Sequence, residues 1–182
     1  IYRTGITQSY NLGASGGNET SNYYASLTYA NWEGVLKGTN KERTTAKINL
    51  THKAFNNRVT FSGSLSGAFE NNDYEDYNAT GVNDVIYQAY SRNPTDSVYN
   101  ANGTLNRTSR LFDNENLLIP INDITNLRTA KFFLGTFKTD VEIINGLIGS
   151  VNFGYTRDDH VNDYFRPKGI YSKIEAGAGH RR

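Results

Sequence analysis

The sequence predicts an all-β protein: a segment of an antiparallel transmembrane β-barrel, with about six strands and long extracellular loops. Three observations predict this fold. Apolar and polar residues alternate along stretches of about ten residues, and the connections between these stretches are alternately short and long. The chain also contains 13% aromatic residues and 17 Gly but only 3 Pro, a composition that favours strands over helices.

The clearest predicted strand covers Arg58–Phe69. One set of alternate residues is Val59, Phe61, Gly63, Leu65, Gly67 and Phe69, and the other is Arg58, Thr60, Ser62, Ser64, Ser66 and Ala68. Strands of soluble proteins usually contain about 5–6 residues, whereas a strand that crosses a membrane needs about 9–11. The length and the pattern therefore indicate a strand with one face in lipid and the other in a wet lumen.

Five further stretches alternate in the same way. They cover residues 6–16, 23–30, 43–52, 131–142 and 146–157. In the second of these, Tyr23, Ala25, Leu27 and Tyr29 share one face. Tyr29 and Trp32 lie toward its long-loop end, where we expect the aromatic girdle of a membrane interface. On the pattern alone, a strand of a large soluble β-sandwich or solenoid is the alternative.

The connections predict the topology. Short ones cover residues 16–21, 52–57 and 143–147, and the last contains the tight-turn pair Asn145-Gly146. Longer ones cover residues 33–42, residues 70–127 and the tail after Thr156. Short turns at one end and long loops at the other are typical of outer-membrane barrels. We therefore expect the short turns in the periplasm and the segment 70–127 on the cell surface.

The segment 70–127 is long enough to need structure of its own. Val82, Val85, Ile86 and Ala89 are spaced as one face of a short helix that ends before Pro94. Residues 97–105 predict a small hairpin around Asn102-Gly103.

Several classes of function are disfavoured by composition. The net charge is +1 with no basic patch, which argues against nucleic-acid binding, and there is no Cys for disulfides or thiolate metal sites. The three His are far apart, Arg157–Asp163 is predicted to be a solvated polar loop, and no catalytic motif occurs. We expect no enzyme activity, no cofactor and no metal site. Because the chain has no Met, we also expect it to be a piece of a longer protein.

One cluster predicts ligand binding. The stretch Glu70–Gly81 places carboxylates around two tyrosines directly after a strand. Aromatic faces, carboxylates and amides are the groups that hold a sugar ring or a peptide. The candidate ligand-binding residues are Asp73, Tyr74, Asp76 and Tyr77. An ordinary solvated loop is the competing interpretation for each of them.

The residues also resemble a known family, the SusC/RagA-type TonB-dependent outer-membrane transporters of Bacteroidota. The resemblance begins with a Gly-Gly turn, a Tyr-Tyr-x-Ser-Leu-x-Tyr strand, a Glu-Gly pair and an Arg that opens the next strand. These residues are Gly16-Gly17, Tyr23–Tyr29, Glu33-Gly34 and Arg43. It continues at Asn93, Pro94, Val98, Tyr99 and Gly103, and in a hairpin at Leu134, Gly135, Glu142, Ile143, Gly146, Leu147 and Asn152–Tyr155.

This resemblance implies that residues 1–182 are part of a 22-stranded barrel in the bacterial outer membrane, in contact with its lipid. It also implies an N-terminal plug and a TonB-contacting segment, neither of which these residues contain. The implied partners are the TonB complex and a SusD-type surface lipoprotein. The implied substrates are glycans, their oligosaccharide fragments or peptides, imported by active transport. A passive porin, a siderophore receptor and a soluble glycan-binding β-domain are the alternatives.

Overall fold

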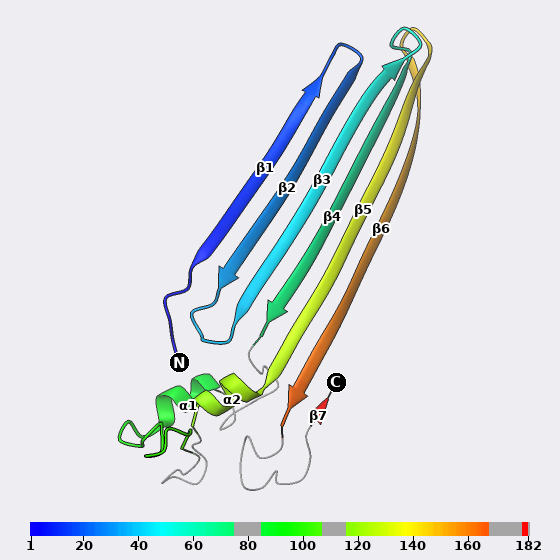
Figure 1. Ribbon diagram of the computed structural model, residues 1–182. Coiled ribbons are helices and arrows are strands. Elements are labelled where there is room, and N and C mark those ends of the chain that lie inside the picture. The colour runs from blue at the N-terminus through cyan, green and yellow to red at the C-terminus, as the bar shows by residue number, and fades with distance from the viewer. Residues whose placement is uncertain (75–84, 107–115, 168–179, 182) are drawn as a thin grey trace.

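The computed structural model describes residues 1–74, 85–106, 116–167 and 180–181. They form one antiparallel sheet in which strands that follow each other in sequence are neighbours (Figure 1). The strands are β1 (Thr7–Gly17), β2 (Ser21–Glu33), β3 (Asn40–Ala54), β4 (Val59–Asp73), β5 (Thr125–Ile144), β6 (Leu147–Arg166) and β7 (His180–Arg181). The predicted fold class, a segment of an antiparallel barrel with six long strands, is confirmed.

The strands are longer than predicted at the end that carries the long connections. β5 and β6 contain 20 residues each, and Asp163 pairs with Leu127. Arg157–Asp163 therefore lies in β6, and its prediction as a polar loop is wrong. Likewise β4 extends to Asp73, and the connection from β2 to β3 shrinks to residues 34–39. Polar residues remain in strands here because pairing with a neighbouring strand satisfies their backbone groups whatever their side chains are.

The short turns all lie at one end of the sheet, and the long connections lie at the other (Figure 1). Asn18 closes the first turn, since its Oδ1 accepts hydrogen bonds from the N–H groups of Thr20 at 3.0 Å and Ser21 at 2.8 Å. Residues 55–57 close the second turn in the left-handed region, and Gly146 closes the third at φ 85°. The predicted alternation of loop lengths is confirmed.

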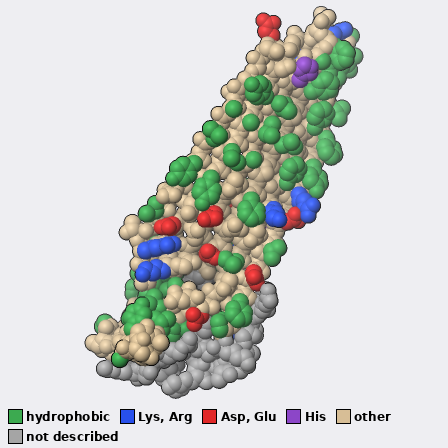
Figure 2. Space-filling view, in the orientation of Figure 1, with side chains coloured by type: hydrophobic (Ala, Val, Ile, Leu, Met, Phe, Trp, Pro, Cys, Tyr) green, Lys and Arg blue, Asp and Glu red, His purple; other side chains and the backbone are tan. Residues whose placement is uncertain are grey.

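The register divides the sheet into an apolar face and a polar face. In one row across the sheet, Leu65 pairs with Ile48 on one side and with Gly135 on the other. The apolar face is formed by Leu12, Tyr23, Leu27, Ile48, Leu50, Phe61, Leu65, Phe69, Phe133, Phe137, Val151, Phe153 and their row partners. Figure 2 shows hydrophobic side chains spread along the sheet, most of them in the half nearer the short turns, and most of the charged side chains in the half nearer the long connections.

The large apolar side chains of this face are exposed. Leu12 is 75% exposed, Val151 is 73% exposed and Leu65 is 49% exposed, and most large apolar residues of this face are exposed as well. A face of this size without a protein layer over it fits contact with lipid, because a soluble sheet covers its apolar face with a second layer.

Trp32 does not belong to the expected aromatic girdle. Tyr29 pairs with Tyr10 on the apolar face, but Trp32 is three residues further on and therefore points to the polar face. There the Lys41 Nζ atom lies 5.8 Å from the centre of the indole ring. Tyr29 and Tyr10 remain in the girdle position.

A small subdomain follows β4. It contains α1 (Val85–Ser91), a hairpin closed by the Tyr99–Leu105 bridge, and α2 (Leu118–Asp123). Leu36, Val85 and Leu117 form its buried core with Ile1, Ala89 and Ile121 packed around them. The predicted helix and hairpin are both confirmed, although Val82 lies outside the described residues. None of the described helices is long and apolar enough to cross a membrane.

Asn116 fixes the hairpin to α2. Its side chain is 3% exposed, and its Nδ2 donates to the carbonyl oxygens of Val98 at 2.7 Å and Asn106 at 3.1 Å. Its Oδ1 accepts from the backbone N–H of Leu118 at 3.2 Å. One buried amide thus satisfies backbone groups of the hairpin and of the first turn of α2.

Candidate ligand-binding site

Two of the four predicted ligand-binding residues lie together where β4 ends. Asp73 is the last residue of β4 and pairs with Leu127, and the Tyr74 N–H donates to the Asn126 carbonyl oxygen at 2.9 Å. Pairing therefore continues past the strand and holds the backbone of both residues in place. The other two, Asp76 and Tyr77, lie outside the described residues.

Asp73 and Tyr74 line a cavity of about 330 Å³. It lies between the end of β4, the β2–β3 connection and the helical subdomain. Its other lining residues are Lys37, Gly38, Val85, Pro120, Ile121, Ile124, Thr125, Asn126 and Leu127. The lining thus combines apolar side chains with several polar groups, which could contact a ligand. The sequence did not point to Lys37 or α2, because nothing in a linear pattern brings segments so far apart to one cavity.

Asp73 lies outside the membrane-spanning part of the sheet, four residues beyond Phe69, where the apolar face ends. It keeps access to solvent, but the strand end and the cavity remove part of its hydration. Burial raises the pKa of Asp73, and the negative charge of nearby Glu42 raises it further. This carboxyl group therefore keeps its proton to a higher pH than an ordinary surface Asp does.

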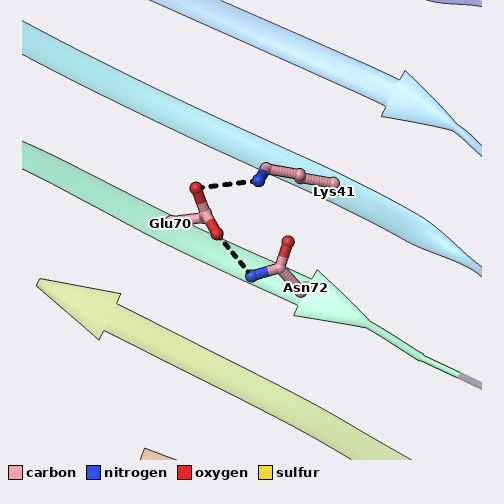
Figure 3. Close-up of polar contacts among 3 residues, drawn as sticks. All are labelled: Lys41, Glu70 and Asn72. Carbon is pink, nitrogen blue, oxygen red and sulfur yellow. Dashed lines mark hydrogen bonds and ion pairs between the residues drawn. The ribbon is translucent and has the colours of Figure 1, made fainter. Parts of the chain in front are cut away.

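A second group of polar residues lies on the polar face near the same end (Figure 3). The Lys41 Nζ atom is 3.1 Å from Glu70 Oε2, and Asn72 Nδ2 donates to Glu70 Oε1 at 2.8 Å. Asn72 is 2% exposed, so the amide is fixed between neighbouring strands. Both oxygens of the Glu70 carboxylate therefore have a partner within the sheet.

Beside Glu70, two arginines reach one cavity of about 210 Å³. Arg43 comes from β3 and Arg128 from β5, on either side of β4. The other lining residues are Ala68, Glu70, Ala130, Phe132 and Asp158. No pattern in the sequence indicates this group. Alternation places each of these residues on a face, but which residues share a row depends on the register between strands.

Metal sites and catalysis each require a particular arrangement of side chains. Within the described ranges, no group of three or more His, Cys, Asp or Glu side chains is arranged to hold a metal ion. The polar groups that do converge are cations, carboxylates and amides without an activated nucleophile beside them. This arrangement suits binding rather than reaction.

The comparisons with known proteins point to transport proteins of the outer membrane. No protein-family model matches the chain. The chain is 31% identical over 182 residues to the TonB-dependent receptor P3 of Formosa agariphila, an alignment that covers 98% of this chain and 18% of that protein. The chain thus spans about a fifth of the length of the curated relative that it matches. The name of that relative, a TonB-dependent receptor, agrees with the outer-membrane location expected from the sequence. The chain is therefore homologous to one segment of a TonB-dependent receptor.

Proposed function

We propose that this chain forms part of the barrel wall of an outer-membrane active transporter that depends on TonB. One observation carries the proposal: a sheet of strands up to 20 residues long has an open apolar face and a polar face, as a barrel wall between lipid and lumen requires. The similarity to a segment of a TonB-dependent receptor supports it.

We further propose that the parent protein is of the SusC/RagA type. The Gly16-Gly17 turn, the Tyr23–Tyr29 strand and the Leu147 hairpin, which carry the resemblance in the sequence, all lie in the strands or short turns of the sheet. Such a protein imports bulky nutrients, either glycans and their oligosaccharides or peptides, together with a SusD-like surface lipoprotein. It belongs to the Bacteroidota.

Uptake by cells tests the proposal. We expect cells that make the intact parent protein to accumulate a fluorescently labelled oligosaccharide, and we expect deletion of TonB or addition of a protonophore to abolish accumulation. A passive porin would admit small solutes under both treatments. Uptake that continues without TonB would contradict the proposal.

Two further measurements distinguish the proposed transporter from a soluble domain and from a siderophore receptor. A soluble glycan-binding domain would be released from cells without detergent, whereas the parent protein should need detergent. A siderophore receptor would import ferric chelates, and iron starvation would induce this uptake.

Copurification tests the proposed partner. A lipoprotein that copurifies with the detergent-extracted protein would support the SusD-like partner. A receptor that runs alone in mild detergent would argue against it.

The cavity beside Asp73 and Tyr74 is the proposed ligand contact at the long-loop end, and Asp76 and Tyr77 are proposed to contribute to the same site. Tyr74 and the apolar lining residues offer surface for a ring or a side chain; the latter are Val85, Pro120, Ile121, Ile124 and Leu127. Asp73 and Lys37 supply hydrogen-bonding groups at its edge.

A further inference from the structure

Arg43 and Arg128 are the two cations of the cavity on the polar face. They come from β3 and β5, on opposite sides of β4, and both residues line the same space of about 210 Å³. Ala68 and Ala130 contribute only methyl groups to the lining, which leaves the space between the arginines open. The cavity is therefore bounded by two long cationic side chains over a floor of small residues.

These two arginines have no anionic partner in the described part of the chain. The obvious candidate, Glu70, pairs with Arg43 in the register, but its oxygens are occupied by Lys41 and Asn72. Arg43 acts on Glu70 only through its electric field. The Nε atom of Arg128 is buried and has no hydrogen-bond acceptor. A buried N–H without an acceptor is unfavourable, so this guanidinium is not fully satisfied by the protein.

The remaining lining residues determine what kind of ligand fits. Phe132 presents an aromatic surface beside the arginines, and Asp158 lies in the next strand as an exposed carboxylate. The guanidinium pair suits an anionic group, because the guanidinium fork matches the geometry of a carboxylate or sulfate. Asp158 repels a second anionic group but accepts hydrogen bonds from hydroxyl groups. The combination fits a sugar ring with one acidic group and free hydroxyls.

We propose that this cavity is a subsite for an acidic sugar residue, held by Arg43 and Arg128 through its anionic group, by Phe132 through the ring and by Asp158 through a hydroxyl. The inference rests on the proposed function, since it names the substrate class of that transporter. A uronate and a sulfated sugar share the required chemistry.

Binding to the intact parent protein in detergent tests the subsite. Isothermal titration calorimetry would compare three probes of equal length: tetragalacturonate, a sulfated galactan tetrasaccharide and neutral galactotetraose. We expect at least one anionic probe to bind about tenfold more tightly than the neutral one, and the double variant Arg43→Gln/Arg128→Gln to lose this preference. Lys47→Gln is the matched control, because it removes an exposed cation from the same face of β3 outside the cavity.

Each outcome of the titrations either supports or overturns the acidic-sugar subsite. Preference for tetragalacturonate identifies a uronate site, and preference for the sulfated probe identifies a sulfate site. Equal binding of all three probes overturns the inference, and so does a preference that survives the double variant or disappears equally in Lys47→Gln. If Arg128→Gln lowers the thermal stability but leaves the preference intact, the arginine is structural and the inference is wrong.

Two additional measurements keep the test interpretable. Arg43→Lys/Arg128→Lys preserves the charges but not the guanidinium geometry, so it should fold and retain only part of the preference. Heat-modifiability on gels shows whether each variant is a folded barrel. Because calorimetry needs no TonB, failure of the subsite is distinguishable from failure of the proposed function, which would appear as uptake that does not depend on TonB.

Discussion

Replacement of Leu65 by Arg tests which face of the sheet meets lipid. The apolar face extends along β4 from Val59 to Phe69, which at about 3.3 Å per residue is about 33 Å of strand. A tilt of about 40° converts this to about 25 Å along the bilayer normal, the height of the apolar band of a barrel. Leu65 lies within about one residue of the centre of this band.

The expected magnitude follows from this position. Arg at a lipid-facing site near the midplane costs about 2–4 kcal/mol, which lowers the ratio of folded to unfolded protein by about 30- to 1,000-fold. Thr136→Arg is the matched control, since Thr136 lies opposite Ser64 on the polar face. Ser64→Arg is a second control and should cost about 1 kcal/mol, because the Ser64 hydroxyl donates to Asn49 Oδ1 at 2.8 Å.

Unfolding of the parent protein in lipid vesicles by guanidinium chloride measures these differences. Greater damage from Thr136→Arg than from Leu65→Arg would mean that the faces are exchanged, and the assignment would be refuted. Leu65→Phe separates the barrel from a soluble sandwich. Lipid accommodates the larger ring, whereas a close-packed core loses about 1–3 kcal/mol to overpacking.

Three further predictions concern the long-loop end. A cysteine at Asn102, in the surface hairpin, should react with an impermeant label on intact cells and a cysteine at Asn56 should not, and the reverse labelling would contradict the topology. Tyr74→Ala should weaken uptake at limiting substrate without lowering the amount of folded barrel, because an aromatic surface worth about 1 kcal/mol is lost from the cavity, and unchanged uptake would remove Tyr74 from the site. Asn116→Ala should increase hydrogen exchange in the subdomain, since it leaves buried backbone groups without partners at a cost of about 1–3 kcal/mol. Asn100→Ala, which removes only exposed hydrogen bonds, should have a smaller effect, and equal exchange in both variants would show that Asn116 does not hold the hairpin to α2.

The strands could be predicted from the sequence where lipid imposes alternation. The apolar residues of Arg58–Phe69 follow period two because one face meets lipid and the other meets water. Beyond the bilayer both faces meet water, so alternation ends although pairing continues. In β6 this applies from His160 onward, whose partner Ala130 lies in the row of Glu70, beyond Phe69. Arg157–Asp159 lie in the rows of Gly67–Phe69 and left no periodic signal because they are charged on both faces. The pairing of β7 with Phe165 and Arg166 depends on a contact across a long connection and was not predicted.

The candidate sites were predictable only in part. Asp73 and Tyr74 were identified because aromatic and acidic residues are adjacent in the sequence. Arg43 and Arg128 are 85 residues apart in sequence, and their shared cavity exists only because both pair with β4 in one particular register. The position of Trp32 on the polar face could have been found, since an odd separation from Tyr29 already places the two side chains on opposite faces.

The polar contacts of the wall also explain how the register is fixed. Near the long-loop end, Phe69 is the last large apolar residue of β4, and Glu70 follows it directly on the polar face. A shift of one residue between β4 and its neighbours would turn Glu70 toward lipid and Phe69 toward the lumen. It would also separate Glu70 from Lys41 and leave a carboxylate unpaired beside the hydrocarbon region. The Lys41–Glu70 pair therefore adds to the preference for the register that brings Arg43 and Arg128 to a common cavity. Lys41 and Asn72 together engage both oxygens of Glu70, and among the described residues this carboxylate forms no ion pair with Arg43 or Arg128.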